Sequence, residues 1–288
     1  MIVARSPEEL EPARRAIGIG VFDGVHRGHR RVLEAMQAAQ LRSTVVTFDP
    51  HPRAVLGTAI ESVATLDRRL ELLEAAGIDE TLVLHVDEEL LALEPEAFVE
   101  SVLLPIGAEV VAAGEDFRFG RARSGDLNLL AQLGFDVRRV PLAPNCSSSL
   151  VRALLAAGEI ERAAVVLGRP PEVEGTVVAG DHRGRALGFP TANLESPPDL
   201  LIPPLGIYAG AALGHRAAIS IGTNPHFGGS ERRIEAFLLD FDADLYGQRL
   251  VVELWERLRD EAAFASEADL IAAIDDDVAR TRAAVRPS

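Results

Sequence analysis

The chain contains no lysine, because all 29 of its basic residues are arginine. A Walker-type phosphate loop, a protein-kinase phosphate site and a Schiff-base enzyme each require a lysine amine, so all three are excluded. Any phosphate chemistry in this chain must therefore use arginine, histidine, backbone N–H groups and metal ions.

Cysteine and long apolar runs are also scarce. The single cysteine, Cys146, cannot form an internal disulfide, which indicates a reducing compartment, and the cytoplasm is the expected location. No run of 18 apolar residues is present, and residues 1–30 lack the basic stretch and apolar core of a signal peptide, so no membrane partner is expected. The net charge of −15 and the pI of about 4.9 would repel nucleic acid, which is therefore not an expected partner. The oligomeric state is left open between a monomer and a transient homo-oligomer.

The 288 residues suffice for two ordinary domains. In the first half, apolar strands alternate with amphipathic helices, which predicts a doubly wound, mainly parallel α/β sheet that binds ligands at the carboxyl ends of its strands. The strands are expected at residues 16–22, 43–48, 81–86, 109–113 and 137–142, and the helices at 29–40, 66–76, 98–104 and 127–133. Two further short helices should follow, ending near Gly168.

The second half has a different pattern. Five short segments separated by glycine, proline and aspartate predict an antiparallel barrel or sandwich. These segments are residues 173–179, 207–213, 217–221, 234–241 and 250–254. Ser266 is expected to open a last helix that carries an apolar stripe. The sequence Arg169-Pro170-Pro171 interrupts the pattern between the halves, so the expected domains are residues 1–169 and 170–288.

Residues 20–29 (GVFDGVHRGH) lie where a buried strand gives way to a helix. Gly24 and Gly28 let the backbone approach a ligand closely, and the free N–H groups of the helix start favour phosphate. His26 and His29 can donate hydrogen bonds to phosphate oxygens as charge builds up in a transition state. Two alternatives remain, a plain turn that carries two histidines, or a zinc site. The zinc alternative lacks an evident third ligand, because Cys146 is far away along the chain.

The H-x-G-H element resembles the nucleotidyltransferase superfamily, whose members bring an acceptor phosphate onto the α-phosphate of ATP and expel pyrophosphate. A second superfamily element, Ile-Ser-Ser-Thr-x-x-Arg, corresponds to residues 146–152 (CSSSLVR). Cys146 and Ser149 replace Ile and Thr, and Leu150 stands where relatives often carry a basic residue. Arg152 is retained, and the resemblance implies that it neutralises the departing pyrophosphate. Taken alone, Arg152 would be a surface arginine of a helix.

Residues 47–52 (TFDPHP), residues 114–120 (GEDFRFG) and Asp126 narrow the resemblance to the adenylylating domain of bifunctional prokaryotic riboflavin kinase/FAD synthetases. In that family these segments line the nucleotide and flavin pocket, so ATP and FMN are the implied substrates of this domain and FAD is its product. The implied nucleotide-binding residues are Gly20, Phe22, Asp23, Gly24, Gly28, Asp116, Ser148 and Ser149. Without the resemblance, residues 49–52 would be only a rigid exit from a strand.

Residues 180–193 (GDHRGRALGFPTAN) carry a second candidate site. The glycines permit close wrapping around a polyphosphate, and two arginines supply positive charge without a lysine. The Thr191 hydroxyl and the Asn193 amide oxygen are hard ligands suited to Mg²⁺. A simple hairpin loop would explain the glycines but not the unit GFPTAN at residues 188–193.

The unit GFPTAN closely matches the riboflavin kinase signature. The match continues through residues 206–209 (GIYA), 221–228 (IGTNPHFG) and 234–247 (IEAFLLDFDADLYG). His226 and His182 depart from it, since relatives usually carry Thr and often carry Lys there. The match implies that Glu235 is the general base that takes the proton of the ribityl 5′-hydroxyl, although a lone glutamate on a strand would otherwise face solvent. The implied nucleotide- and flavin-binding residues are Gly180, Arg183, Gly184, Gly188, Pro190, Thr191 and Asn193, and the last two are also the implied Mg²⁺ ligands.

The resemblance extends from about residue 17 to about residue 282. It implies a Rossmann-like nucleotidyltransferase domain followed by a small antiparallel β-barrel kinase domain with a C-terminal helix. The expected function is phosphorylation of riboflavin to FMN with ATP and Mg²⁺, and then adenylylation of FMN to FAD with a second ATP. One alternative is a kinase that has lost the transferase, which only Ser149 and Leu150 favour. Another is a non-catalytic flavin-binding protein, which would not need both Glu235 and the histidine pair.

Overall fold

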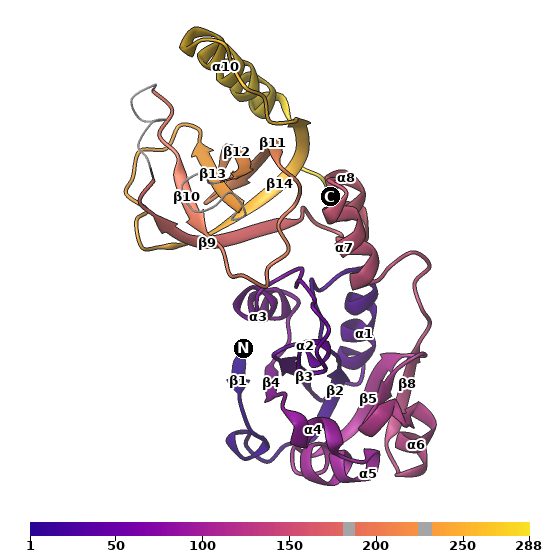
Figure 1. The fold of residues 1–288 in the computed structure, drawn as a ribbon. Coiled ribbons are helices and arrows are strands. Elements are labelled where there is room, and N and C mark those ends of the chain that lie inside the picture. The colour runs from indigo at the N-terminus through magenta and orange to yellow at the C-terminus, as the bar shows by residue number, and fades with distance from the viewer. Residues whose placement is uncertain (181–187, 224–231) are drawn as a thin grey trace. The chain divides into compact units, whose positions relative to one another are not determined.

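A computed structural model of the chain describes residues 1–180, 188–223 and 232–288 (Figure 1). Four residues named above, Arg183, Gly184, His182 and His226, lie outside the described residues. Contacts divide the chain into two units, one of residues 1–60 and 65–147 and one of residues 61–64 and 148–288.

The first unit is built on a six-stranded sheet in the order β1-β4-β3-β2-β5-β8, in which every neighbouring pair is parallel. The strands are β1 (Ile2–Ala4), β2 (Arg15–Ile19), β3 (Arg42–Asp49), β4 (Glu80–His85), β5 (Ala108–Gly114) and β8 (Asp136–Val140). The predicted parallel α/β sheet is confirmed. The edge strand β1 was not predicted, because three residues are too few for a period to show.

Helices cover both faces of this sheet (Figure 1). Residues of α1 (Arg27–Gln37) and α3 (Leu66–Ala75) pack with Val110 and Ala112 of β5, whereas Val111 and Ala113 belong to the cluster on the opposite face. That second cluster includes residues of α5 (Pro95–Phe98), of the π-helical turn Val99–Leu103 and of α6 (Leu127–Gln132). Burial on both faces explains why the strands appear in the sequence as continuous apolar runs. The remaining elements are α2 (Pro52–Val55), α4 (Glu88–Ala92), two 3₁₀ turns at Pro7–Glu9 and Arg121–Arg123, and a small hairpin of β6 (Arg118–Phe119) and β7 (Gly125–Asp126).

The second unit contains a closed antiparallel barrel in the order β10-β13-β12-β11-β14-β9. Its strands are β9 (Glu172–Val178), β10 (Ala192–Glu195), β11 (Gly206–Ala212), β12 (His215–Thr223), β13 (Arg232–Leu238) and β14 (Arg249–Arg259). The structure therefore selects the barrel from the two predicted alternatives. The helices α7 (Ser148–Ala156) and α8 (Ile160–Leu167) belong to the same unit, and α8 packs against β14.

Arginines attach the last helix, α10 (Glu267–Ala283), to the barrel. Ser266 caps it as predicted, since its side chain accepts a hydrogen bond from the Asp269 N–H at 3.2 Å. Arg259 forms a forked pair with Asp277, and Arg216 donates to the carbonyl of Ala284 at the end of the helix. A forked guanidinium suits such contacts better than a lysine amine.

A buried ion pair joins two strands of the first unit. The Arg15 Nε donates to Glu80 Oε2 at 2.6 Å, and both side chains are at most 1% exposed. Burial alone would raise the pKa of Glu80, but hydrogen bonds from Arg15, Thr44 and Arg42, together with the charge of Arg15, outweigh burial and hold that pKa below its usual value. The stabilisation is therefore present above the ordinary glutamate pKa of about 4.3 and is lost as the pH falls further.

Replacing Arg15 with methionine should lower the free energy of unfolding by about 3–5 kcal/mol, because the buried carboxylate of Glu80 loses its only fully buried cation among the described residues and keeps only the partly exposed Arg42, 3.1 Å away. Urea denaturation at pH 7 measures the change. The matched control is Arg14→Met, since the Arg14–Glu109 pair is exposed and its loss should cost at most about 1 kcal/mol. An equal loss of unfolding free energy in Arg15→Met and Arg14→Met would contradict the view that the buried ion pair contributes more than the exposed one.

Candidate functional sites

The turn between β2 and α1 has an uncommon backbone. Phe22, Gly24 and Val25 all adopt positive φ angles, of 54°, 77° and 40°. Left-handed conformations of residues other than glycine cost of order 1–3 kcal/mol each and cluster at functional sites. The side chain of Phe22 is buried and fixes the turn, and the next residues begin α1. The turn thus presents the N-terminus of α1 beside the carboxyl end of β2, as the sequence predicted.

His26 and His29 lie against each other at this helix start. The His26 Nδ1 accepts a hydrogen bond from the His29 backbone N–H at 3.3 Å, and the two rings stack with centroids 3.6 Å apart. Because Nδ1 is an acceptor, the proton of a neutral His26 is on Nε2, which can donate to a ligand. A Cβ atom on Gly28 would lie 3.0 Å from the His26 ring, so the small residue leaves room for the stack.

The buried Nδ1 of His29 has no hydrogen-bond partner among the described residues. Burial, and then the nearby His26 and Arg69, hold the pKa of His29 well below its usual value. His29 is therefore neutral at pH 7 and can donate one hydrogen bond to a phosphate. A buried polar atom without a partner is unusual in a folded protein and suggests a place for a ligand.

Arg69, on α3, is a residue that sequence reasoning missed. Its Nη1 donates to the carbonyl of Val21 at 2.7 Å and to that of Phe48 at 3.3 Å. The guanidinium therefore ties the turn after β2 to the end of β3. An arginine inside an amphipathic helix gives no sequence signal of this role, because its partners are backbone groups that only the fold brings near.

Cys146 lies beside the histidine pair in space although it is far from it in the sequence. Its Sγ accepts a hydrogen bond from the Gly28 N–H at 3.1 Å and lies 3.6 Å from the His26 Nδ1. Within residues 1–180, 188–223 and 232–288, no group of three His, Cys, Asp or Glu side chains is arranged to hold a metal ion. The proximity of Cys146 therefore does not supply the zinc alternative with a complete ligand set in this part of the chain.

The remaining predicted residues of the first unit lie in three places, the turn after β2, the turn after β5 and the start of α6. Gly20 directly follows β2, and Asp23 is buried in the turn. Asp116 is exposed in the turn after β5, which neighbours β2 in the sheet. Asp126 instead caps α6, accepting hydrogen bonds from the N–H groups of Asn128 and Leu129 at 2.8 and 3.0 Å.

Three predicted residues, Ser148, Ser149 and Arg152, belong to the second unit. They lie in α7, which begins at Ser148. The Arg152 Nη2 donates to the Ser149 Oγ at 3.4 Å, as expected for residues three apart on a helix.

The barrel brings the two kinase segments of the sequence together. β10 pairs with β13 so that Asn193 lies directly opposite Glu235. The Thr191 Oγ1 donates to Glu235 Oε2 at 3.1 Å. The hydroxyl, amide and carboxylate that the sequence singled out therefore form one cluster. β10 itself was not predicted, because its residues fall in a segment that was interpreted as a ligand-binding loop.

Arg233 completes this cluster and was also missed. Its Nε donates to Asn193 Oδ1 at 2.8 Å and lies 3.2 Å from Glu235 Oε1. Residues two apart on a strand share a face, so the alternation of β13 could have placed Arg233 beside Glu235. Its contact with Asn193 could not be foreseen without the pairing of β10 with β13.

The glycine-rich segment borders the same cluster. The ring of Phe189 packs edge-on against Phe237, with centroids 5.6 Å apart, which attaches the segment that holds Gly188 and Pro190 to β13. A Cβ atom on Gly180 would lie 2.3 Å from Asn193 Nδ2 and 2.6 Å from Arg233 Nη2. Gly180 thus supports the cluster by the absence of a side chain.

From the riboflavin kinase activity that the sequence resemblance implies, substitution of Gly180 by alanine is expected to lower the rate of riboflavin phosphorylation by about 10- to 100-fold, because it displaces Asn193 and Arg233 by an ångström or more. The initial rate of FMN formation from riboflavin and ATP measures the effect. Adenylylation of added FMN serves as the internal control and should not change. A Gly180→Ala protein with both rates at the wild-type level would contradict this packing.

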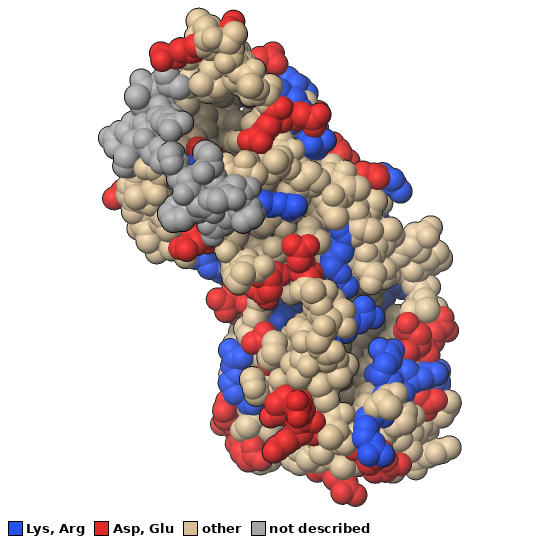
Figure 2. Space-filling model, in the orientation of Figure 1, with Lys and Arg blue, Asp and Glu red and all other residues tan. Residues whose placement is uncertain are grey.

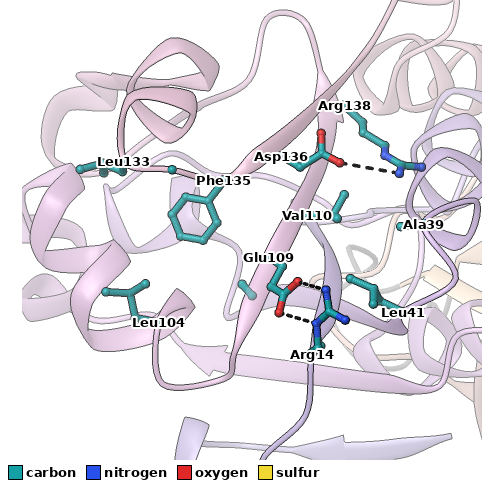
Figure 3. Close-up of a pocket in the computed structure, with 12 residues that line it drawn as sticks. Arg14, Ala39, Leu41, Leu104, Glu109, Val110, Leu133, Phe135, Asp136 and Arg138 are labelled. Atoms are coloured by element: carbon teal, nitrogen blue, oxygen red, sulfur yellow. Dashed lines mark hydrogen bonds and ion pairs between the residues drawn. The ribbon is translucent and has the colours of Figure 1, made fainter.

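A separate pocket of about 550 Å³ lies at the amino ends of β5 and β8 (Figure 3). The turn that carries the histidines follows the carboxyl end of β2, which is parallel to β5. Its two arginines face carboxylates, since Arg14 forms a forked pair with Glu109 and Arg138 lies 3.7 Å from Asp136. Much of the remaining wall is apolar, and includes Leu41. The pocket therefore lacks the chemistry predicted for the nucleotide sites.

On the molecular face drawn in Figure 2, arginines are interleaved with aspartates and glutamates. None of the helices in the described part of the chain combines the length and the apolar character needed to cross a membrane.

Comparison with known proteins gives consistent matches over both halves. Residues 8–149 match the family model described as FAD synthetase, and residues 167–285 match that described as riboflavin kinase. A bifunctional riboflavin kinase/FMN adenylyltransferase of Listeria monocytogenes is 34% identical over 96% of this chain and 94% of its own length. One from Escherichia coli is 36% identical over 90% and 89%. A crystal structure described as a macrolide-efflux protein from Streptococcus pneumoniae matches with a TM-score of 0.87 and 27% identity over 98% of both chains.

Proposed function

The chain belongs to the bifunctional riboflavin kinase/FMN adenylyltransferases, and from this premise we propose which residues carry each reaction. The enzyme transfers a phosphoryl group from ATP to riboflavin, which gives FMN, and transfers AMP from a second ATP to FMN, which gives FAD and pyrophosphate. We assign the adenylyl transfer to residues 1–169 and the phosphoryl transfer to residues 170–288. The separate family matches at residues 8–149 and 167–285 support this division.

In the kinase site, Glu235 acts as the general base. It takes the proton of the ribityl 5′-hydroxyl, whose oxygen then bonds to the γ-phosphorus of ATP as the bond to ADP breaks. The hydrogen bond from Thr191 orients the carboxylate. The oxygens of Thr191 and Asn193 fit Mg²⁺, because both are hard ligands within one cluster. Bound Mg²⁺ would neutralise the phosphate charge.

In the adenylyltransferase site, a phosphate oxygen of FMN attacks the α-phosphorus of ATP and pyrophosphate leaves, with no covalent enzyme intermediate. The N–H groups at the start of α1 and the imidazoles of His26 and His29 stabilise the charge on the phosphorus oxygens. The neutralisation of the pyrophosphate is assigned to Arg152 from its place in the motif at residues 146–152. Support for the histidine role comes from the buried Nδ1 of His29, for which the described part of the chain provides no hydrogen-bond partner.

The observation that carries the kinase assignment is the convergence of Thr191, which precedes β10, Asn193 on β10 and Glu235 on β13 in one cluster. Incubation of the purified protein with riboflavin, ATP and Mg²⁺, followed by chromatography of the flavins, tests the whole proposal. FMN should form first and FAD should follow. FMN without FAD would favour a kinase that has lost the transferase, and neither product would contradict the proposal.

We also propose that the enzyme works in the cytoplasm, which its single cysteine and lack of disulfides support. The proposed assembly is a monomer or a transient homo-oligomer.

A further inference from the structure

The guanidinium of Arg233 occupies a central position in the kinase cluster. It contacts Asn193 Oδ1 on β10 and Glu235 Oε1 on its own strand, at 2.8 and 3.2 Å. Asn193 is buried, with 7% of the residue exposed, so its amide oxygen has few other directions in which to find a cation. The Arg233 guanidinium thus contacts both the proposed Mg²⁺ ligand, Asn193, and the proposed general base, Glu235.

This arrangement conflicts with metal binding. A divalent cation at Asn193 would compete with the guanidinium for the same amide oxygen. Two positive charges a few ångströms apart also repel each other in a partly buried site, where the effective dielectric constant is lower than that of water. The Arg233 contact therefore opposes a metal contact at Asn193.

We propose that Arg233 is an internal cation that holds Asn193 and Glu235 in place before the metal–nucleotide complex binds, and that withdraws when the complex binds. This inference rests on the proposed kinase function. In the ligand-free protein Arg233 balances the charge of Glu235 and keeps the amide oxygen directed into the site. Arg233 is thus a positioning residue, and it raises the concentration of Mg²⁺ that the site requires.

The withdrawn guanidinium has an acceptor nearby. Gly222 on β12 lies opposite Arg233, and a Cβ atom on Gly222 would lie 2.5 Å from Glu261 Oε1. Directly opposed residues of antiparallel strands share a face. The Glu261 carboxylate therefore lies on the same face as Arg233, one strand away from Glu235, and can receive the guanidinium.

The test compares Arg233→Met with Arg232→Met in the full-length protein. Methionine keeps most of the aliphatic stem and removes the charge. Arg232 is the matched control, because it lies on the same strand but donates to the carbonyls of Ile202 and Pro203. Mg²⁺ is titrated into protein with ADP and riboflavin, and riboflavin fluorescence reports formation of the complex without turnover.

The Mg²⁺ midpoint should fall about tenfold or more in Arg233→Met, as expected for removal of a like charge near the metal, and should not change in Arg232→Met. The kcat for FMN formation should fall in Arg233→Met, because the Glu235 carboxylate loses the guanidinium that orients it, and Arg233→Lys should restore part of it. An unchanged or raised midpoint in a folded Arg233→Met protein would overturn the inference. If the wild-type protein made no FMN, the proposed function itself would fail, so the two failures are distinguishable.

Discussion

Replacement of Glu235 by glutamine is expected to lower riboflavin phosphorylation by about 10²–10⁴-fold, the usual contribution of a general base. Glutamine keeps the size of the side chain and can still accept the hydrogen bond from Thr191, so the cluster should retain its packing. It cannot take the proton of the riboflavin hydroxyl. The initial rate of FMN formation from riboflavin and ATP measures the loss.

Adenylylation of added FMN should be unchanged in Glu235→Gln, because the proposed transferase residues lie elsewhere in the chain. Glu256→Gln, on β14 of the same barrel, is the matched control and should leave both rates unchanged. A Glu235→Gln protein that is folded but has lost both reactions would contradict the separation of the two sites. One that retained full kinase activity would exclude Glu235 as the base.

Conversion of His29 to alanine should lower FAD formation by about 10²–10³-fold, the usual cost of removing one donor that stabilises a developing charge. The variant also loses the ring that stacks on His26. FMN should therefore accumulate from riboflavin, and chromatography of the flavins should show little FAD. Release of pyrophosphate from FMN and ATP gives the rate directly.

His215→Ala is the control for this variant. That imidazole lies in the barrel, where it packs edge-on against Phe241, and both activities should persist without it. Pyrophosphate release by a His29→Ala protein at the wild-type rate would exclude the proposed role of His29.

The pH dependence of the transferase provides a further test of His29. Because the pKa of His29 is held well below its usual value, this group stays neutral from pH 8 down to pH 6.5. Titration of His29 should therefore make no contribution to the pH dependence of pyrophosphate release between pH 8 and pH 6.5. A fall in rate with a midpoint near 6.5 that is absent from His29→Ala would show that the imidazole titrates normally.

Much of the fold and of both sites could be predicted from the sequence. The alternation of strands and helices, the cap at Ser266 and the histidines at the start of α1 depend on residues close together in the chain. These features are visible in the sequence as hydrophobic periodicity, as a capping residue before a helix and as the spacing of a motif. The strands of the six-stranded sheet and of the barrel that were missed, β1 and β10, are three and four residues long, which is too short for such signals.

The tertiary structure decided the contacts between distant residues. Neither the proximity of Cys146 to His26 nor that of Arg69 to Val21 has a local cause, since 120 and 48 residues separate the partners. The contact of Arg233 with Asn193 arises from the register between β10 and β13. The sequence by itself thus determined which residues have the chemistry for phosphoryl and adenylyl transfer. Strand pairing and helix packing alone decided which other side chains hold them, because those contacts are made only once the chain has folded.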